Sequence, residues 1–200
     1  KQAEKLCGLC EEKQTMLNVA DTQGIELIIG GETFSMFEGE IIESSRWLDM
    51  EEGYTARRVV WCSPKGKKVE ILIKRMTSFV QPSLFTIEYC VKALNFSDEL
   101  TFISTHIGDV KNYCNPNDPR VAGESFQHLV PVRASIENGV SYVVTNTSKS
   151  NLTVCTAVEN SVSKMAKAWS YTEGHGTVTE LTTNICEDET VTLVKYTIFA

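Results

Sequence analysis

Residues 133–144 read RASIENGVSYVV and give the clearest indication of the fold class. Two β-rich runs, 133–136 and 140–144, flank the triplet Glu137-Asn138-Gly139. Asn-Gly is the strongest short signal for a hairpin, because both residues tolerate the positive φ that a tight turn between antiparallel strands requires. The stretch therefore predicts two antiparallel strands joined by that turn.

The same kind of signal recurs on both sides of this hairpin. Apolar and polar residues alternate with a period of two, as expected when one face of a sheet is buried. Gly30-Gly31 and the Ser-Pro-Lys-Gly sequence at 63–66 supply turns between successive runs. The runs expected to form strands are 25–29, 33–37, 57–61, 68–73, 86–94, 152–158 and 191–198.

These runs predict an all-β fold, an antiparallel β-sandwich in which two sheets bury their apolar faces against each other. The opening, residues 1–17, places Leu6, Cys10 and Leu17 near helical spacing, so at most a short helix is expected near the N-terminus. A chain of 200 residues can bury one sizeable core, and we expect residues 1–200 to form a single domain.

The formal net charge of −7 is spread along the chain, with basic residues among the acidic ones. No basic patch emerges that could neutralise phosphates, so nucleic-acid binding is not expected. No apolar run is long enough to cross a bilayer, and the first residues carry no export signal. Seven cysteines, an odd number at irregular spacing, favour free thiols. We therefore expect a cytoplasmic protein with no membrane partner.

Cys7-Gly-Leu-Cys10 has the spacing of a zinc half-site or a redox pair. Zinc needs about four ligands, and no second Cys/His pair has matching spacing. We therefore expect neither a metal nor a cofactor.

Three histidines, His106, His128 and His175, are the obvious candidates for acid–base chemistry. A sandwich enzyme of the aldose mutarotase type would need a histidine acid opposite a carboxylate base in one cleft. Nothing in the spacing links any of the three to a carboxylate, so we expect surface or hydrogen-bonded structural histidines and name no catalytic residue.

Two further sets of side chains have a functional and a structural interpretation. The lysines around the 63–66 turn could hold a phosphate, but a solvated hairpin tip is the preferred interpretation because a glycine-rich loop or helix N-terminus is missing. The tryptophans could stack on sugar rings from an exposed face, but such residues more often pack in a core. These residues are Lys65, Lys67, Lys68, Trp47, Trp61 and Trp169.

Residues 113–127 break the strand pattern. Their Asn-Pro-Asn-Asp-Pro sequence at 115–119 has turn chemistry and no periodicity, which makes an unusually long connection inside a compact domain. Long loops often carry function. With Arg120 in the loop and His128 at its end, we expect this segment to face a further domain or a partner subunit.

The string RWLDMEEGYTARRVVW at 46–61, followed by SPKG at 63–66, resembles the N-terminal domain of glycoside hydrolase family 65, the family of maltose, trehalose and kojibiose phosphorylases. In that family a Leu-Asp-Met, a glycine, an arginine and a tryptophan recur in this order. The similarity extends through residues 24–50, LFTIEYCVKALNF at 84–96 and STHIGDVKN at 104–112.

The resemblance implies a galactose-mutarotase-like supersandwich that precedes an (α/α)6 barrel, which holds a glutamate general acid and the phosphate site. Neither the barrel nor the family's Gly-Asn-Gly-Tyr type opening is recognisable here, so we expect a truncated N-terminal domain. By itself it would be inactive. It would support the catalytic barrel of the same polypeptide and contribute to a homodimer.

For the complete protein, the resemblance implies inverting phosphorolysis of an α-glucosyl disaccharide such as maltose, trehalose or kojibiose. The barrel would bind that disaccharide and inorganic phosphate, with phosphate in place of the activated water of an inverting hydrolase. Three alternatives remain open: a domain of an acid trehalase-like hydrolase, a stand-alone carbohydrate-binding module, and a mutarotase-like enzyme.

Overall fold

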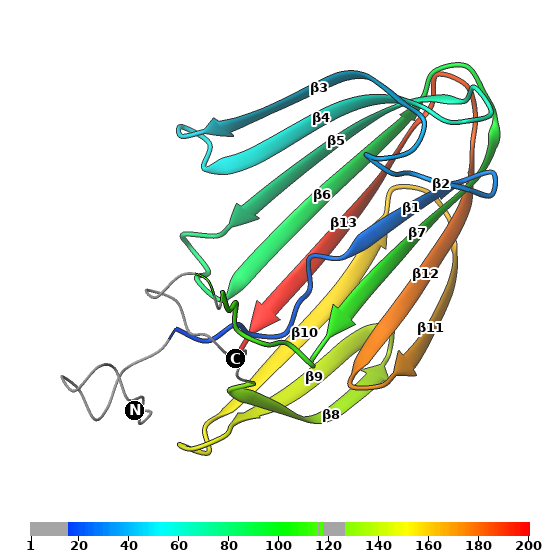
Figure 1. The fold of residues 1–200 in the computed structure, drawn as a ribbon. Helices are drawn as coiled ribbons and strands as arrows, with labels where there is room; N and C mark the ends of the chain where they lie inside the picture. The colour runs from blue at the N-terminus through cyan, green and yellow to red at the C-terminus, as the bar shows by residue number, and fades with distance from the viewer. Residues whose placement is uncertain (1–15, 116, 118–126) are drawn as a thin grey trace.

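The computed structural model of the protein describes residues 16–115, 117 and 127–200. In these residues the fold is all β: thirteen strands and no helix (Figure 1). All strand pairs are antiparallel and form two sheets of eight and five strands. The prediction of an antiparallel β-sandwich is confirmed. The N-terminal helix prediction concerns residues that lie almost wholly outside the described part.

The larger sheet has the order β3-β4-β5-β6-β13-β10-β9-β8. Its strands are β3 (Glu40–Asp49), β4 (Tyr54–Cys62), β5 (Lys68–Thr77), β6 (Leu84–Ala93), β13 (Thr190–Phe199), β10 (Thr153–Val162), β9 (Val140–Thr147) and β8 (Leu129–Glu137). The smaller sheet has the order β11-β12-β7-β1-β2. Its strands are β11 (Lys167–Glu173), β12 (Gly176–Ile185), β7 (Asp98–Ile107), β1 (Ile25–Ile29) and β2 (Glu32–Thr33).

The hairpin predicted from the Asn-Gly sequence is β8–β9. Glu137 and Val140 are its last paired residues, and Asn138 and Gly139 have φ values of 52° and 80°. The β4–β5 hairpin around the 63–66 turn is confirmed as well, with Cys62 opposite Lys68. The alternating residues of β6 point inward as predicted: Ile87, Tyr89, Val91 and Ala93 are all buried.

The strand predicted at 33–37 is wrong beyond Thr33, where β2 ends. The chain leaves the sheet because Phe34 packs edge-to-face on Trp61, with ring centroids 5.4 Å apart. The indole Nε1 of Trp61 also donates a hydrogen bond of 2.7 Å to the carbonyl oxygen of Glu38. The segment after β2 therefore covers one end of the core instead of extending the sheet.

The apolar core lies between β4, β5, β6 and β13 of the larger sheet and β1, β7 and β12 of the smaller one. Trp61, Phe102, Leu27, Ile71 and Leu193 are almost fully buried in it. Burying a side chain of this size contributes about 1.5–3 kcal/mol, so this cluster is the main source of stability.

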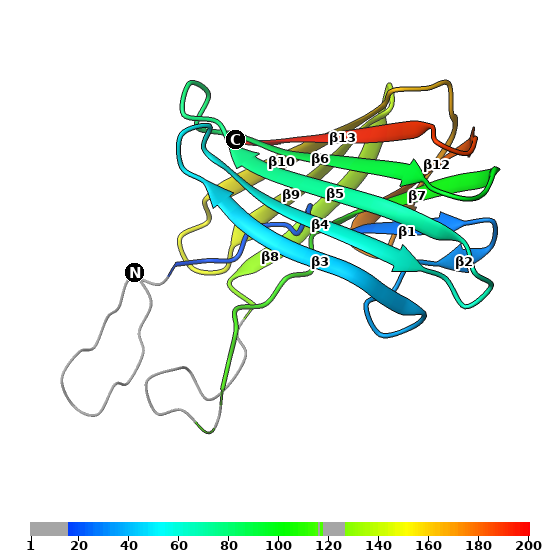
Figure 2. The same ribbon diagram turned by 90° about the horizontal axis from the view of Figure 1, so that it is seen from above.

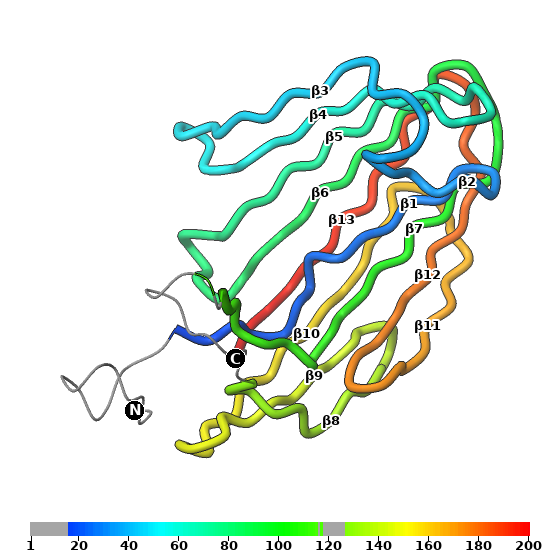
Figure 3. Tube along the Cα trace, viewed as in Figure 1, coloured from blue at the N-terminus to red at the C-terminus, as the bar shows by residue number. Residues whose placement is uncertain are grey.

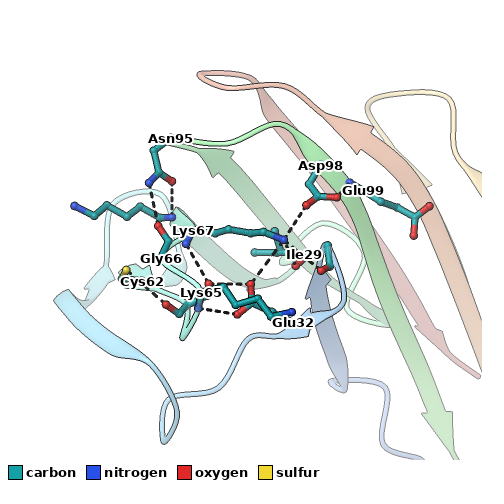
Figure 4. Close-up of polar contacts among 12 residues, drawn as sticks. Ile29, Glu32, Cys62, Lys65, Gly66, Lys67, Asn95, Asp98 and Glu99 are labelled. Atoms are coloured by element: carbon teal, nitrogen blue, oxygen red, sulfur yellow. Dashed lines mark hydrogen bonds and ion pairs between the residues drawn. The ribbon is translucent and has the colours of Figure 1, made fainter.

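A polar cluster ties the two sheets together at one end (Figure 4). The ammonium group of Lys67, in the β4–β5 turn, donates to the carboxylate of Asp98 at 2.8 Å and to the carbonyl oxygens of Ile29 and Gly30 at 3.3 and 3.2 Å. It also lies 3.7 Å from the carboxylate of Glu32. Turns of both sheets therefore meet at one cation.

Glu32 is buried, and its carboxylate has neutral donors as well. It accepts hydrogen bonds from the Ser63 hydroxyl and from the backbone N–H of Lys65, each 3.0 Å long. The interpretation of this turn as a solvated tip is thus wrong for Lys67, whose side chain is only 19% exposed. A phosphate is disfavoured here, because the lysine faces two carboxylates.

Candidate functional site: an arginine-lined cleft

The two sheets differ in width, and the sandwich is open along one side. The smaller sheet packs on β4, β5, β6 and β13 of the larger one, whereas β3 and the adjoining ends of β4 and β5 extend beyond it (Figures 1 and 3). No residue of β3 is buried. Figure 2, seen from above, shows β3 as the free edge of the larger sheet. The inner face of β3, and of the adjoining ends of β4 and β5, is therefore open.

Arg46, Arg57 and Arg75 come from three neighbouring strands and share this inner face. Arg46 of β3 lies directly opposite Arg57 of β4. Arg57 lies opposite Ile73 of β5, which packs against the apolar core. Arg75 follows two residues later and is therefore a diagonal neighbour of Arg57. Such neighbours lie about 7–8 Å apart, within the reach of long side chains.

Within the described residues, none of these three guanidinium groups forms an ion pair with a carboxylate or a hydrogen bond with another side chain. The Nε of Arg57 is buried and makes no hydrogen bond. Burial and the neighbouring charge of Arg46 both lower the pKa of Arg57; Tyr89 raises it in part, and Arg75 lowers it further by a smaller amount. Like charges held this close on one sheet face destabilise the fold unless an anion compensates them.

The outer face of the same strands is built differently. Arg58, the residue after Arg57, forms ion pairs with Glu43 and Glu70 on the two flanking strands. Lys74 pairs with Glu88 at 3.4 Å and lies over the ring of Tyr54, 5.3 Å from its centroid. The outer face of the larger sheet thus has compensated charges, whereas the inner face does not.

Three adjoining hollows make up the cleft, and Arg75 lines all of them. The one between the arginines has a volume of about 380 Å³ and is lined also by Leu48, Thr55 and Ile73. A larger one of about 880 Å³ continues toward residues 18–23 and the loop after β5. A third of about 290 Å³ reaches Phe34 and Tyr89.

Exposed apolar side chains lie at and near the larger hollow, and Leu48, Met76 and Phe79 line it. The turns after β3 and β5 meet there, since a Cβ atom on Gly53 would lie 3.4 Å from the ring of Phe79. We call this group the apolar rim; its residues and exposed fractions are Leu48 (61%), Met50 (86%), Met76 (41%), Phe79 (92%) and Val80 (95%). A group of exposed large apolar side chains is typical of a place where another protein surface docks.

The three histidines do not meet in one cleft. His106 on β7 is 1% exposed, and its Nδ1 lies 2.8 Å from the hydroxyl of Ser141 on β9. His128 is 8% exposed and precedes β8, and His175 is exposed in the β11–β12 turn. None of them lines the three hollows of the cleft.

The other candidates lie apart from one another. Trp61 is in the core, as the structural interpretation expects, whereas Trp47 and Trp169 are 41% and 67% exposed. Cys7, Cys10 and Arg120 fall outside the described residues. In the described part of the chain, no three His, Cys, Asp or Glu side chains are grouped as metal ligands. The same part contains no helical segment able to span a bilayer.

One buried cation was missed by sequence reasoning. Lys195 on β13 is 0% exposed and donates to the carbonyl oxygens of Gly24 and Thr105, at 3.1 and 2.7 Å. Burial lowers its pKa from 10.5 to about 7. His106 belongs to the same polar interior, where burial and the charge of Lys195 lower the histidine pKa to about 4. The strand periodicity places residue 195 inward with Leu193 and Thr197, and this was the available signal.

Curated relatives resemble most of the chain. The α,α-trehalose phosphorylase of Geobacillus stearothermophilus is 38% identical over 157 residues, which cover 77% of this chain and 20% of that enzyme. The α,α-trehalose phosphorylase of Thermoanaerobacter brockii is 36% identical over 154 residues, again 20% of the enzyme. The kojibiose phosphorylase of Halothermothrix orenii is 26% identical over 136 residues and 16% of its length.

A solved structure of a candidate kojibiose phosphorylase from the human microbiome has the same fold. The TM-score is 0.76 at 11% identity, over 92% of this chain and 22% of that one. The family profile described as the N-terminal domain of glycosyl hydrolase family 65 matches residues 1–200. The motif at 46–61 that suggests this family supplies Arg46 and Arg57 of the cleft. The chain therefore belongs to glycosyl hydrolase family 65, as its N-terminal domain.

Proposed function

We propose that this chain is the non-catalytic N-terminal sandwich of a disaccharide phosphorylase and that it supports the catalytic barrel of the same polypeptide. The relatives that carry this domain are named as trehalose and kojibiose phosphorylases. The chain spans only 20% of the length of the first of these, which leaves ample sequence for a catalytic domain. The complete protein would then perform inverting phosphorolysis of an α-glucosyl disaccharide, with α,α-trehalose as the first substrate to test.

The apolar rim is the observation that carries the supporting role. Five large apolar side chains of β3, β5 and the turns that follow them are exposed, three of them line the cleft, and Phe79 and Val80 are more than 90% exposed. Covering them would remove apolar surface from water at a gain of roughly 25 cal/mol per Å². A barrel of the same polypeptide is the partner that the family relationship suggests.

The experiment uses the complete polypeptide that carries this chain. We expect it to release glucose 1-phosphate from trehalose, maltose or kojibiose only when inorganic phosphate is present. Glucose release at equal rates with and without phosphate would instead indicate a hydrolase of the acid trehalase kind. In the same protein, Phe79→Ser and Val80→Ser should lower thermal stability, whereas Trp169→Ser on the far sheet serves as the exposed aromatic control.

A homodimer in the cytoplasm completes the proposal. The five cysteines of the described residues, Cys62, Cys90, Cys114, Cys155 and Cys186, are all free thiols, as suits a reducing compartment. The loop 113–127 is our candidate for the surface that faces the barrel or the second subunit. Replacing Arg120 and His128 with alanine tests this, because unchanged dimer mass and unchanged disaccharide affinity would remove the loop from the proposal. His128 is buried, so Arg120→Ala is the more informative of the two.

A carbohydrate-binding module is the second candidate, and the exposed indole of Trp169 on the outermost strand β11 favours it. Exposed aromatic faces stack on sugar rings. Calorimetry of the chain with maltose, trehalose and longer glucans separates the two functions. Binding that Trp169→Ala abolishes would support the module.

A further inference from the structure

The uncompensated arginines require an explanation that the supporting role does not supply. An arginine with a purely structural role in this sheet is exemplified by Arg58, which has two carboxylate partners. Arg57 lies one residue away on the opposite face, with two further arginines beside it and a buried Nε that has no acceptor. A buried donor left unsatisfied costs about 1–3 kcal/mol. The inner face therefore carries positive charge that no carboxylate of the described residues compensates.

We infer that the hollow between Arg46, Arg57 and Arg75 binds a phosphate group, either as inorganic phosphate or as the phosphate of a sugar ester. This site lies in the N-terminal domain and involves no catalytic step. It goes beyond the proposed function and holds whether or not the complete protein is a phosphorylase.

The geometry favours a tetrahedral oxyanion. Each guanidinium presents a planar fork of N–H donors that matches two phosphate oxygens, and three forks on adjacent strands can converge on one group. Thr55 lines the same hollow and lies opposite Arg75, so its hydroxyl can donate a further hydrogen bond. Neither glutamate nor aspartate lines this hollow.

The size of the hollow also favours a small ligand. Its volume of about 380 Å³ lies within the range of roughly 300–1,000 Å³ that is usual for small-molecule pockets. Ile73 and Leu48 provide an apolar wall against which the ring of a sugar ester could lie. The phosphate would be fixed by the arginines, and the remainder of the molecule would contact this wall.

Isothermal titration calorimetry of the chain, in a buffer of low ionic strength without oxyanions, tests the site. The probes are inorganic phosphate, glucose 1-phosphate and, as the neutral control, glucose. We expect both phosphate compounds to bind and glucose to give no heat. Equal affinities would show that the phosphate group alone is recognised, and tighter binding of the ester would show that the apolar wall contributes.

Matched variants decide where binding occurs. Arg57→Gln removes a cleft charge and should weaken binding at least tenfold, and Arg46→Gln, at an exposed position that tolerates substitution, should do the same. Arg58→Gln removes the neighbouring charge on the outer face and should change affinity less than twofold. Circular dichroism confirms that each variant is folded.

Three results would overturn the inference. They are the absence of heat with both phosphate compounds, binding of glucose as tight as that of its phosphate ester, and equal losses in Arg57→Gln and Arg58→Gln. The first of these would indicate that the arginines instead meet carboxylates of another protein surface. Activity of the complete protein is measured separately, so failure of the phosphate site and failure of the proposed function are distinguishable.

Discussion

Arg57 and Arg58 are consecutive in β4, yet they have opposite electrostatic environments. Arg58 points to the outer face and is paired with Glu43 and Glu70. Arg57 points to the inner face, where its neighbours are Arg46 and Arg75. Because adjacent strand residues alternate between faces, one step along the chain separates a compensated cation from an uncompensated one.

The first prediction concerns the stability of the free chain. Arg57→Met should raise the free energy of unfolding by about 1 kcal/mol, since it removes an unsatisfied buried donor and a repulsive charge. Arg58→Met should lower it, because the two glutamates lose their partner. Urea unfolding at low salt measures both. A loss of stability in Arg57→Met as large as that in Arg58→Met would show that Arg57 is compensated after all.

The second prediction concerns the polar cluster of Figure 4. Lys67→Met should destabilise the fold by about 2 kcal/mol, because Asp98 and two carbonyl groups lose a charged donor and the buried carboxylate of Glu32 loses a nearby cation. Lys65→Met is the matched control, since only the backbone N–H of Lys65 bonds to Glu32. The control should stay within about 0.5 kcal/mol of the parent. Urea unfolding measures both variants. Equal losses in the free energy of unfolding for Lys67→Met and Lys65→Met would contradict the assigned role of the Lys67 ammonium.

The third prediction is a rise in stability with pH caused by Lys195. Its pKa is about 7 in the folded chain and 10.5 ordinarily, so between these values the unfolded chain binds more protons. The free energy of unfolding therefore increases as pH rises from 7, by at most about 1.4 kcal/mol per unit. We expect on the order of 2 kcal/mol between pH 7 and 9 relative to Lys195→Met. The same dependence of the unfolding free energy on pH in the parent and in Lys195→Met would contradict the prediction.

The fourth prediction concerns acid. His106 has a pKa of about 4 in the folded chain and 6.5 ordinarily, so the unfolded chain takes up the proton first as pH falls. Stability should therefore be lost between pH 6.5 and 4, with a slope of up to about 1.4 kcal/mol per unit from this residue. His106→Gln should have a flatter profile over this range. Nuclear magnetic resonance titration of the imidazole gives the pKa directly, and a value near 6.5 would refute the prediction.

Much of the fold could be predicted from local patterns. Asn138-Gly139 marks its hairpin because turn chemistry acts over two residues, and the alternation of β6 follows from one buried face. Strands β3, β7, β11 and β12 were missed. In β12, threonines occupy buried positions such as Thr177, Thr179 and Thr183, so the apolar alternation is weak although the strand is largely buried.

The candidate site could be predicted only in part. The family motif contains Arg46 and Arg57, but their cross-strand pairing and the diagonal approach of Arg75 depend on the register of three strands. Whether a charge is compensated depends on side chains far apart in sequence, as the contact of Lys67 with Asp98 illustrates. Lys195 was missed because a lysine is ordinarily placed at the surface. The carbonyl groups that accept its hydrogen bonds are brought to it only by the folded structure.

The central claim is that this sandwich serves chemistry performed elsewhere in the same polypeptide. The most direct measurement compares, at equal molar concentration, the release of glucose 1-phosphate from trehalose, maltose and kojibiose by the isolated 200-residue chain and by the complete protein. We predict phosphate-dependent turnover by the complete protein and none by the chain alone. Turnover by the isolated chain, or none by the complete protein with any of the three sugars, would contradict the account.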